Sequence, residues 1–543
     1  MLTRQAEQGK IKIGLISIPF IFRENRKAFE HTFCPPLALG ILFSQLKEKG
    51  YDVYQDDLSI RFHRNNFDAD ANSGKRFNRN LYFQEGRIRA YVKTGDDGEV
   101  EDEISGILEG LPIDYKSIKI WLISIPENIH NSSNILFTLA LSKFLKKNNP
   151  SYIVLGGHGF ALGLLTSKYP LGGIVDFIVP EEGEEAVITV IEKIQRGEAG
   201  EPANKVKVVR KPTNIIVAPD FSGLPLEQYN LSFLDNKEIG IDNELVRNFL
   251  ASNVLVLQYK FIKGCPNKCA FCESSGLELR AVHKPKDVVD DLVEMQERFK
   301  PTGYFFLSDT INISKSYITE LCDEISRRGL KILWTDCATA SGLDKETLEK
   351  IKKSGCIRLI FGMETGSPNM LKSVNKKIKL DELESVLKAA SAYGIWTGIE
   401  VICGLPHETD RDIELTIGFL NRNKEFIDKI YCNMFDLRPH SLMRLYPEDY
   451  GIENIREANL YSESAANFTV FLFDEVNGLR WEDKKKQIAE SYSRVMRETE
   501  SIYDIPNYLQ EHLLFYLYNS FHDKAIIKKH YEKIKGFYNR EQE

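Results

Sequence analysis

Three cysteines in one short loop carry the strongest chemical signal in the sequence. Cys265, Cys269 and Cys272 lie within residues 263–276, directly after an apolar run that predicts a β-strand. Their spacing lets a short loop bind three corners of an iron–sulfur cube, whereas a structural cluster normally takes a fourth cysteine from the chain. One iron is then left open to chelate the amino and carboxylate groups of a substrate. We interpret the three cysteines as ligands of a catalytic 4Fe–4S cluster.

A zinc site made of the three cysteines and one histidine is the alternative, with His283 as the nearest downstream histidine. Zinc ligands usually come as closely spaced pairs rather than as this triplet, so the spacing favours the cluster. A second cluster built from Cys322, Cys337 and Cys356 has no local spacing to support it. We interpret the remaining cysteines as small buried side chains. They are Cys34, Cys322, Cys337, Cys356, Cys403 and Cys432.

Composition indicates a multidomain globular protein. The chain has 543 residues, enough for about three to four domains of ~150 residues each. Its 43% hydrophobic and 27% charged residues exclude a disordered chain, and no apolar run approaches the ~18 residues that span a bilayer. The polar N-terminus lacks the apolar core of a signal peptide, so we expect a cytoplasmic protein without membrane association. With a net charge of −7 and only short basic runs, nucleic acid is not the expected partner.

Strands alternate with amphipathic helices from residue 254 onward, which predicts a partial (β/α)6, TIM-like barrel over residues 251–450. Parallel barrels place their chemistry on the loops that follow the strands. Chemically unusual residues fall there: Cys265, Asp309, Asp336 and Glu364 follow the first four predicted strands in turn. The predicted strands cover residues 254–259, 303–308, 331–335, 357–363, 396–403 and 429–435.

An α/β domain with a doubly wound, Rossmann-like parallel sheet is predicted for residues 1–205. Its predicted strands cover residues 11–17, 51–55, 118–125, 152–157 and 176–179. Ligands of such sheets lie beyond the carboxyl ends of the strands. The candidate binding residues at those ends are Pro19, Phe20, Ser124, Gly156, Gly157, His158, Glu181, Gly183 and Glu184.

Three other segments complete the expected domain plan. Residues 61–115 interrupt the N-terminal alternation and are expected to form an insertion of strand or loop character. Residues 206–250 are expected to form a linker. Residues 451–543, rich in aromatic side chains, are expected to form a helical domain that covers the barrel mouth and contacts the substrate.

Beyond the cysteine triplet, the second half of the chain resembles radical S-adenosylmethionine (SAM) enzymes. Residues 362–368, together with residues 375–376, resemble the fourth strand of that family. In the family, a glutamate and a nearby hydroxyl of this strand commonly contact the ribose or methionyl part of SAM. The resemblance therefore implies that Glu364 and Ser367 bind SAM.

Further SAM contacts follow from the same resemblance. Residues 404–409 resemble the turn after the family's fifth strand, which implies that the backbone of Gly404 and Leu405 borders the adenine. Phe271 matches the position whose backbone reads the adenine edge. Asp309 is assigned to the SAM site by its place after the second strand, with a local role in its loop as the alternative.

The N-terminal domain resembles the cobalamin-binding domain of cobalamin-dependent radical SAM enzymes, which implies that its candidate residues contact cobalamin. One departure concerns residues 17–23, where many cobalamin domains carry a histidine that ligates cobalt and this chain has none. We therefore expect the loop of His158 to contact the corrin or its tail rather than the metal. The segments that carry the resemblance are residues 35–37, 39–40, 49–53, 156–158 and 180–185.

The two resemblances together imply a radical SAM enzyme that uses cobalamin to methylate an unactivated carbon of a peptide or small molecule. An external electron donor such as flavodoxin or ferredoxin is implied as a partner. A cobalamin-binding radical SAM enzyme that catalyses a rearrangement, cyclisation or ring contraction is the first alternative. A tRNA methylthiotransferase is disfavoured because only Cys34 precedes the triplet, and a non-catalytic sensor is disfavoured because it needs no SAM site.

Overall fold

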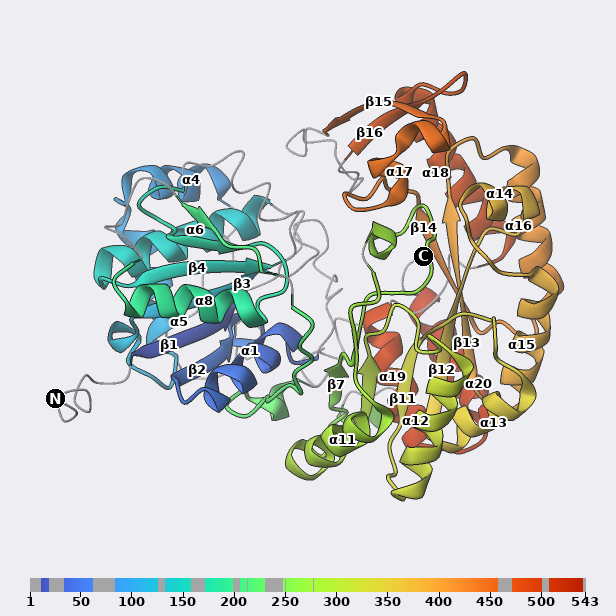
Figure 1. Cartoon of the computed structure of the whole chain (residues 1–543), viewed down its shortest axis with the longest axis horizontal. Helices are drawn as coiled ribbons and strands as arrows, with labels where there is room; N and C mark the ends of the chain where they lie inside the picture. Colours follow the sequence, from blue (N-terminus) through green and yellow to red (C-terminus); the bar gives the residue numbers. More distant parts are fainter. Residues whose placement is uncertain are drawn as a thin grey trace. The chain divides into compact units, whose positions relative to one another are not determined.

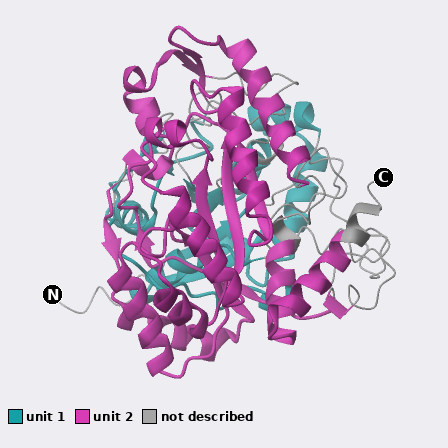
Figure 2. Ribbon diagram, turned by 90° about the vertical axis from the view of Figure 1, so that its right-hand side faces the viewer, with its two compact units in different colours: residues 1–235 teal, residues 236–543 magenta. Residues whose placement is uncertain are grey.

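The computed structural model divides the chain into two compact units (Figures 1 and 2). Unit 1 is Met1–Asp235 and unit 2 is Asn236–Glu543. The residues that the structure describes are 11–18, 34–61, 84–125, 132–157, 171–198, 206–211, 213–229, 248–249, 251–276, 278–457, 471–500 and 507–540.

Unit 1 is built on a parallel sheet of six strands in the order β2-β1-β3-β4-β5-β6. Helices α1 (Leu37–Glu48), α6 (Ser132–Asn148) and α8 (Glu184–Gln195) each lie between two strands in the sequence. This alternation confirms the predicted Rossmann-like sheet. The strands are β1 (Lys12–Ser17), β2 (Asp52–Asp57), β3 (Ile120–Ile125), β4 (Tyr152–Gly157), β5 (Phe177–Val179) and β6 (Lys207–Val208).

The carboxyl ends of these strands meet in one row. Ser17 of β1 lies beside Asp57 of β2 on one side and Ser124 of β3 on the other. Ser124 in turn lies beside Gly156 of β4, and Gly156 beside Val179 of β5. The strand order reverses between β1 and β3, and such a switch point is where open α/β sheets bind their ligands. The row is therefore the edge of unit 1 at which a ligand is expected.

The predicted insertion differs from the expected strand or loop structure. Its described part contains two helices, α4 (Glu85–Thr94) and α5 (Gly98–Glu109). Asp97 begins α5 as its N-cap, because its carboxylate accepts a hydrogen bond from the Val100 N–H. The polar composition concealed these helices, whose buried stripes are narrow. Residues 62–83 lie outside the described part of the chain.

Part of the predicted linker is integrated into unit 1. The side-chain amide of Gln55 donates to the backbone carbonyl of Asp220 at 2.9 Å. The Tyr229 hydroxyl donates to the Asp57 carboxylate at 2.9 Å, and both side chains are buried. Residues up to Tyr229 are thus held on the sheet, while residues 230–247 lie outside the described range.

Unit 2 is built on a second parallel sheet of six strands in the order β14-β13-β12-β11-β10-β7. A helix follows each of the first five strands, so the predicted run of strand–helix units is confirmed. The strands are β7 (Val256–Tyr259), β10 (Gly303–Phe306), β11 (Trp334–Ala338), β12 (Cys356–Glu364), β13 (Trp396–Cys403) and β14 (Lys429–Met434). The helices are α11 (Pro285–Phe299), α12 (Lys315–Arg327), α13 (Lys345–Lys353), α14 (Pro368–Ser373), α15 (Leu380–Ala392) and α16 (Asp410–Arg422).

Strand β11 begins three residues later than the predicted start at residue 331. The fully buried Trp334 anchors it: its ring stacks on Phe306 at 5.4 Å, and its indole N–H donates to the Ser354 carbonyl. As a consequence Asp336 lies inside the strand, which corrects its predicted place on the loop that follows.

The C-terminal region is mostly helical, with α18 (Trp481–Glu498), α19 (Asn507–Ser520) and α20 (Lys524–Arg540). It also contains an antiparallel hairpin, β15 (Ile452–Glu457) with β16 (Phe471–Glu475), which the expectation of helices alone missed. The hairpin lies toward one end of unit 2 and α19 lies toward the other (Figure 1).

The expected cap over the barrel mouth is wrong for α19 and α20. A Cβ at Gly303, the first residue of β10, would lie 2.0 Å from the Phe515 ring of α19. The Lys524 ammonium of α20 lies 2.6 Å from the carboxylate of Asp428, directly before β14. The Tyr518 hydroxyl donates to the backbone of Gly394, before β13. These helices therefore close the amino end of the sheet, opposite the catalytic end.

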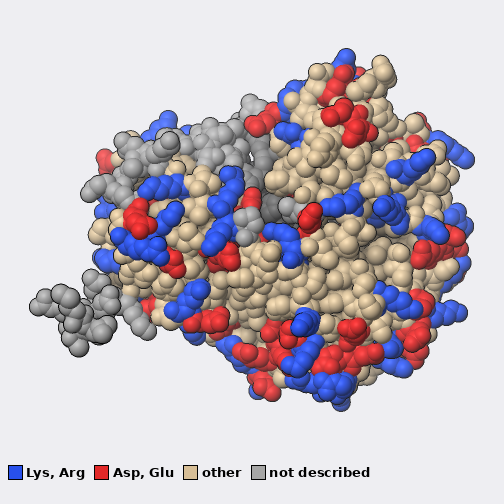
Figure 3. Space-filling model, in the orientation of Figure 1, with Lys and Arg blue, Asp and Glu red and all other residues tan. Residues whose placement is uncertain are grey.

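Charged side chains of both signs are interspersed on the face shown in Figure 3, with no single-sign patch spreading over it. This mixture agrees with the modest net charge of −7. Among the described residues, no helix is long and apolar enough to cross a membrane.

A buried ion pair joins α19 to the sheet. The Arg358 guanidinium on β12 lies 2.5 Å from the Glu511 carboxylate, and the Arg358 side chain is 0% exposed. Arg358 also donates to the Tyr431 hydroxyl, which donates to Gln510 on α19. Helix α19 thus supplies the counter-charge for an arginine inside the sheet.

We predict that Arg358→Met lowers the free energy of unfolding by about 3 kcal/mol, because it leaves the Glu511 carboxylate buried without its cation. The double variant Arg358→Met/Glu511→Leu should regain most of that loss, since neither charge remains. Urea unfolding followed by circular dichroism measures both. Equal midpoints for the wild type and the single variant would contradict the structural role of the pair.

Candidate functional site

A short hairpin holds both ends of the cysteine loop. Strand β8 (Ile262–Lys263) precedes the loop and pairs antiparallel with β9 (Ala281–Val282), which follows it. The chain enters the loop at Gly264, where φ is +88° and a Cβ would lie 2.1 Å from the Glu278 carbonyl oxygen. Only glycine fits there, so the turn into the loop is fixed by the backbone.

Hydrogen bonds coil the loop around its cysteines. The Cys272 N–H donates to the Cys269 carbonyl at 3.1 Å. The Ser275 N–H and hydroxyl both donate to the Cys272 carbonyl, at 3.1 and 2.6 Å. These bonds bring the second and third cysteines onto one turn of backbone.

The segment after β12 is fastened to the same loop. The Ala270 N–H donates to the Val374 carbonyl at 2.8 Å, and the Asn375 side-chain amide donates to the Lys268 carbonyl at 2.6 Å. The loop after the first strand and the motif after the fourth strand therefore form one structural unit.

The three thiols are largely buried, with Cys265 and Cys269 8% and 9% exposed. Burial raises the pKa of all three, that of Cys272 to about 11. Metal ligands must be thiolates, so a bound cation is what makes charge at these positions favourable. Soft thiolates on one short loop are the donor set that an iron–sulfur cluster takes.

The zinc alternative finds no support in the geometry. The Nδ1 atom of His283 lies 3.5 Å from the Asp291 carboxylate on α11. Within the described ranges, no three His, Cys, Asp or Glu side chains are arranged to hold a single metal ion. A 4Fe–4S cluster binds its cysteines through different irons, so its ligands need not converge on one point.

Glu364 ends β12 in a strained conformation and is paired with a lysine. Its φ is +68°, a left-handed value that costs energy for a residue with a side chain. Its carboxylate accepts a hydrogen bond from the Lys376 ammonium at 2.8 Å, and both side chains are nearly buried. A Cβ at Gly362 would lie 2.7 Å from the Lys376 Nζ atom, so this glycine makes room for the pair.

The charge state of Lys376 follows from its neighbours. Burial lowers its pKa, but the charges of Glu364 and Cys269 together raise it above the usual lysine value. The ammonium also lies 6.0 Å from the centre of the Phe271 ring. A permanent positive charge thus sits among Glu364, Cys269 and Phe271, all predicted site residues.

Ser367 lies close to this pair in the sequence, but its hydroxyl is already hydrogen-bonded to other residues of the protein. Its hydroxyl donates to the Asp412 carboxylate of α16 at 2.5 Å. It also accepts from the Met370 N–H as the N-cap of α14. A SAM contact of Ser367 stays a prediction.

The turn after β13 is tightly constructed. Gly404 has φ +90°, and its N–H donates to the Glu408 carboxylate at 2.6 Å. A Cβ there would lie 2.2 Å from Ile488 of α18. Leu405 is fully buried, and its carbonyl accepts from the Lys484 ammonium of α18 at 2.7 Å. Helix α18 therefore supports the turn that was predicted to border the adenine.

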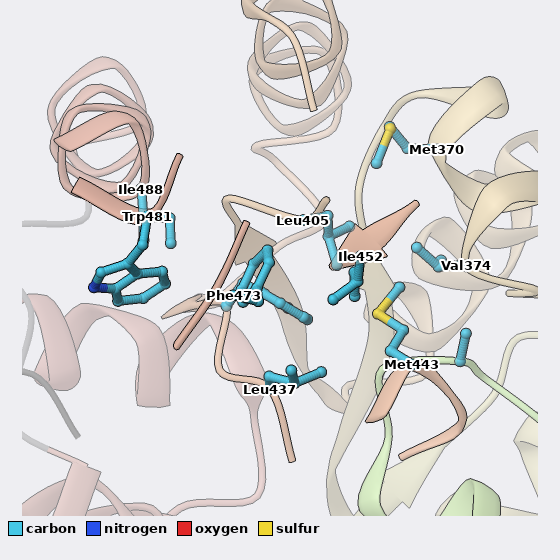
Figure 4. Close-up of a cluster of buried hydrophobic side chains, with 11 residues drawn as sticks. Met370, Val374, Leu405, Leu437, Met443, Ile452, Phe473, Trp481 and Ile488 are labelled. Atoms are coloured by element: carbon cyan, nitrogen blue, oxygen red, sulfur yellow. The ribbon is translucent and has the colours of Figure 1, made fainter. Parts of the chain in front are cut away.

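An apolar cluster lies under this turn (Figure 4). Ala270, next to Cys269 in the loop, belongs to it together with Leu405 and the hairpin residue Phe473. The partly buried Phe271 packs against it. The remaining members are Met370, Val374, Phe435, Leu437, Met443, Ile452, Trp481 and Ile488.

Two aspartates at the second and third strands have different roles. The exposed Asp309 accepts a hydrogen bond from the Ser274 hydroxyl of the cysteine loop at 3.0 Å. The fully buried Asp336 accepts from the backbone N–H groups of Ser308 and Cys337 at 3.2 and 2.7 Å. Burial raises the pKa of Asp336 well above its usual value. Asp336 thus fixes the start of the loop that carries Asp309.

Sequence reasoning missed three charged residues of this region. Lys376 was named only as part of the fourth-strand motif. A lysine that close to a glutamate in a strand-end motif is a signal that the two side chains form an ion pair. Glu408 follows Gly404 by four residues, a spacing typical of a carboxylate that caps a turn. Glu400, inside β13, had no local signal.

In unit 1, several predicted residues lie on the row formed by the carboxyl ends of the strands. Ser124 and Gly156 belong to this row. Gly157 follows with a φ of +154°, and a Cβ there would lie only 2.4 Å from the Ile125 carbonyl oxygen, so no side chain fits. Gly183 is the N-cap of α8, whose first residue is Glu184.

The remaining predicted binding residues of unit 1 are not among the described members of this row. Glu181 lies 3.7 Å from Arg210 in a surface ion pair. Pro19, Phe20 and His158 fall outside the residues that the structure describes.

Comparisons with known proteins agree with this geometry. Residues 259–420 match the model of the Radical SAM superfamily. The chain contains a radical SAM domain. The matched residues include the cysteine loop, Glu364 with Lys376, and the Gly404 turn.

Two curated proteins are similar to parts of the chain. An uncharacterised methyltransferase of Pyrococcus horikoshii is 28% identical over 35% of this chain and 41% of its own length. An anaerobic magnesium-protoporphyrin IX monomethyl ester cyclase of Rubrivivax gelatinosus is 27% identical over 50% of this chain and 49% of its own length. The matched part of the chain thus spans less than half of the length of each of these relatives.

One solved structure shares the fold beyond the radical SAM domain. The radical SAM methyltransferase TsrM from Kitasatospora setae, solved with cobalamin and a 4Fe–4S cluster, has a TM-score of 0.59 and 13% identity. The match covers 98% of this chain and all of the TsrM chain. Both units of the chain therefore have counterparts in a known fold.

We predict that replacing Cys265, Cys269 and Cys272 with alanine abolishes iron binding by the radical SAM domain. Anaerobically reconstituted wild type should hold about four irons and four sulfides per chain, and the triple variant almost none. Cys337→Ala is the matched control, because this thiol lies on β11 outside the loop, and it should retain the iron. Zinc in the wild type, or unchanged iron in the triple variant, would refute the assignment.

Proposed function

We propose that this protein reductively cleaves SAM and, with cobalamin, methylates an unactivated carbon of a peptide or small-molecule substrate. The observation that carries the proposal is the fastening of the three-cysteine loop to the segment of Lys376, which pairs with Glu364. This supports the proposal, because the loop that would hold the cluster is joined to the segment whose lysine pairs with the carboxylate that would bind SAM, within the residues that match the Radical SAM superfamily.

The cysteine loop would hold a 4Fe–4S cluster, which when bound supplies the electron that splits SAM into methionine and a 5′-deoxyadenosyl radical. Glu364 would accept hydrogen bonds from the ribose or methionyl part of SAM, and the ion pair with Lys376 would hold that carboxylate in place. The backbone of the Gly404 turn and of Phe271 would border the adenine. Asp309, which accepts a hydrogen bond from Ser274 of the cysteine loop, would be a further SAM contact.

Unit 1 would hold cobalamin at the carboxyl edge of its sheet. Ser17, Ser124, Gly156 and Gly157 give this edge small side chains, which allow a planar macrocycle to approach the backbone. Cobalamin when bound supplies the methyl group that the substrate receives. No histidine belongs to the described row, so we propose that the chain provides no histidine ligand to cobalt from this edge.

The second candidate is a rearrangement or cyclisation that uses the same cofactors without methyl transfer. The similarity to the Rubrivivax cyclase over half of the chain favours keeping this candidate. In both cases the substrate would be a peptide or small molecule, and an external donor such as flavodoxin or ferredoxin would deliver the electron.

Product analysis separates the candidates. We predict that protein reconstituted anaerobically with iron, sulfide and hydroxocobalamin converts SAM to 5′-deoxyadenosine under strong reductant. During methylation a second SAM molecule leaves as S-adenosylhomocysteine, in equal amount with methylated product. Formation of 5′-deoxyadenosine without S-adenosylhomocysteine would favour the rearrangement. Formation of neither compound would refute the proposal.

We predict that Glu364→Gln lowers deoxyadenosine formation by about tenfold or more, because an uncharged amide makes weaker hydrogen bonds to SAM than a carboxylate. Iron content should stay at the wild-type level, since Glu364 is not a cluster ligand. Glu349→Gln on the exposed side of α13 is the control and should keep full activity. Wild-type turnover by Glu364→Gln would contradict the SAM contact.

A further inference from the structure

The segment that contains α14 is rich in cations and has no anion of its own. Residues 366–380 contain four lysines and neither aspartate nor glutamate, although the whole chain carries a net charge of −7. One of the four, Lys376, is paired with the nearly buried Glu364. The side chains of the other three are exposed, so they present positive charge to the solvent: Lys372, Lys377 and Lys379.

These three lysines have no counter-charge within the described part of the chain. No carboxylate there lies within ion-pair distance of Lys372, Lys377 or Lys379. The dipole of α14 accounts for Lys372 in its last turn, but Lys379 is the N-cap of α15, where a helix dipole disfavours a cation. Asp381 and Glu382 serve the first turn of that helix. Local helix electrostatics therefore explain one lysine of the three.

Backbone hydrogen bonds fix this part of the chain as a compact turn, residues 372–379, which we call the lysine turn. The Lys376 N–H donates to the Leu371 carbonyl at 2.8 Å. The Asn375 N–H donates to the Lys372 carbonyl at 3.2 Å, and Asn375 has a φ of +53°. This pair of bonds around a left-handed residue is a common way to end a helix. The lysines are thus displayed on a defined backbone.

The lysine turn adjoins the exposed side of the cysteine loop. Between the buried Cys265 and Cys269, residues 266–268 are exposed. The Asn375 side-chain amide donates to the Lys268 carbonyl at 2.6 Å, which brings the two backbones together. The positive surface therefore lies beside the loop whose thiols would bind the cluster.

We propose that the lysine turn is the docking surface for the protein that delivers the electron, and that this partner carries acidic side chains around its redox group. The inference rests on the proposed function, which needs an electron from outside the chain, and it adds the place and the charge of the contact. One electron leaves the donor in each encounter and is consumed when a carbon–sulfur bond of SAM breaks.

A charged surface suits this kind of encounter. Electron-transfer complexes are weak and use small interfaces, commonly below about 1,200 Å² in total. Complementary charges raise the rate of association and orient the partners without requiring tight binding. The donor also has to approach the cluster closely, because electron transfer slows steeply with the distance between redox groups. The lysine turn meets both needs, since its exposed cations stand next to the cysteine loop.

The test uses a flavodoxin as the acidic probe and a basic cytochrome c as its cationic counterpart. The glutamate variant reverses the charge of the surface: Lys372→Glu/Lys377→Glu/Lys379→Glu. The arginine variant keeps that charge: Lys372→Arg/Lys377→Arg/Lys379→Arg. The matched control makes the same change in net charge at three exposed lysines before β11 and on α20, at the amino end of the sheet: Lys331→Glu/Lys529→Glu/Lys533→Glu.

Binding is measured first, because it needs no turnover. Biolayer interferometry under anaerobic conditions records the affinity of each reconstituted protein for oxidised flavodoxin. We expect the glutamate variant to bind about tenfold more weakly than the wild type, because three attractions become repulsions. The arginine variant and the control should match the wild type, and cytochrome c should not bind the wild type. Raising the salt from about 20 to about 200 mM should weaken wild-type binding, since the Debye length shortens, and this dependence should vanish in the glutamate variant.

Turnover is measured with two reductants on the same preparations. With reduced flavodoxin, the glutamate variant should show a KM for flavodoxin about tenfold higher than that of the wild type. With dithionite, a small reductant that needs no docking surface, all variants should form deoxyadenosine at the wild-type rate. Iron content should also be equal in all of them.

Three results would overturn the inference. Equal flavodoxin binding by the wild type and the glutamate variant means that the lysine turn is not the docking surface. Binding of cytochrome c to the wild type means that the surface does not select an acidic partner. A slower dithionite reaction in the glutamate variant means that the lysines support the SAM site instead. A wild type that binds flavodoxin but forms no deoxyadenosine with either reductant refutes the proposed function itself, so the two failures are distinguishable.

Discussion

The ion pair between Lys376 and Glu364 is the interaction on which the catalytic end of unit 2 depends. It holds the last residue of β12 in a left-handed conformation that is otherwise unfavourable. The same segment is fastened to the cysteine loop through Val374 and Asn375. A shift of this segment would therefore move the carboxylate, the loop and the ammonium together. Gly362 permits the arrangement by leaving room for the Lys376 side chain.

The two ends of the unit 2 sheet are supported by different parts of the C-terminal region. Helix α18 and the β15–β16 hairpin pack beside the Gly404 turn, where Lys484 and Ile488 fix the backbone. Helices α19 and α20 close the amino end, where Glu511 neutralises Arg358. The catalytic end is thus free of these last two helices, while at the opposite end they supply the carboxylate that pairs with the buried Arg358.

Much of this architecture could be predicted from the sequence because both sheets consist of short apolar strands separated by amphipathic helices. The cysteine loop was also predictable, since its three ligands are local in sequence. The partnership of Glu364 and Lys376 was not, because it joins residues 12 positions apart across an irregular segment. Aromatic stripes predict that α19 is buried, but not which end of the sheet it covers. The polar helices α4 and α5 were missed because composition outweighed the N-cap signal of Asp97.

The contrast between predictable cofactor chemistry and unpredictable substrate has a physical origin. Cofactor contacts come from loops at strand ends, where turns and charged caps need particular residues at particular spacings. A substrate contact on the inner face of a sheet needs only a position whose side chain points inward, and every second residue of a strand has one, whatever its type. Glu400 shows how little the sequence discloses of such a face: in sequence it is one polar residue in an apolar strand, and only the register places it beside Gly362 and Tyr431, within the influence of Glu364 and Lys376. The reaction type follows from the motifs, whereas the choice of substrate follows from side chains that no motif contains.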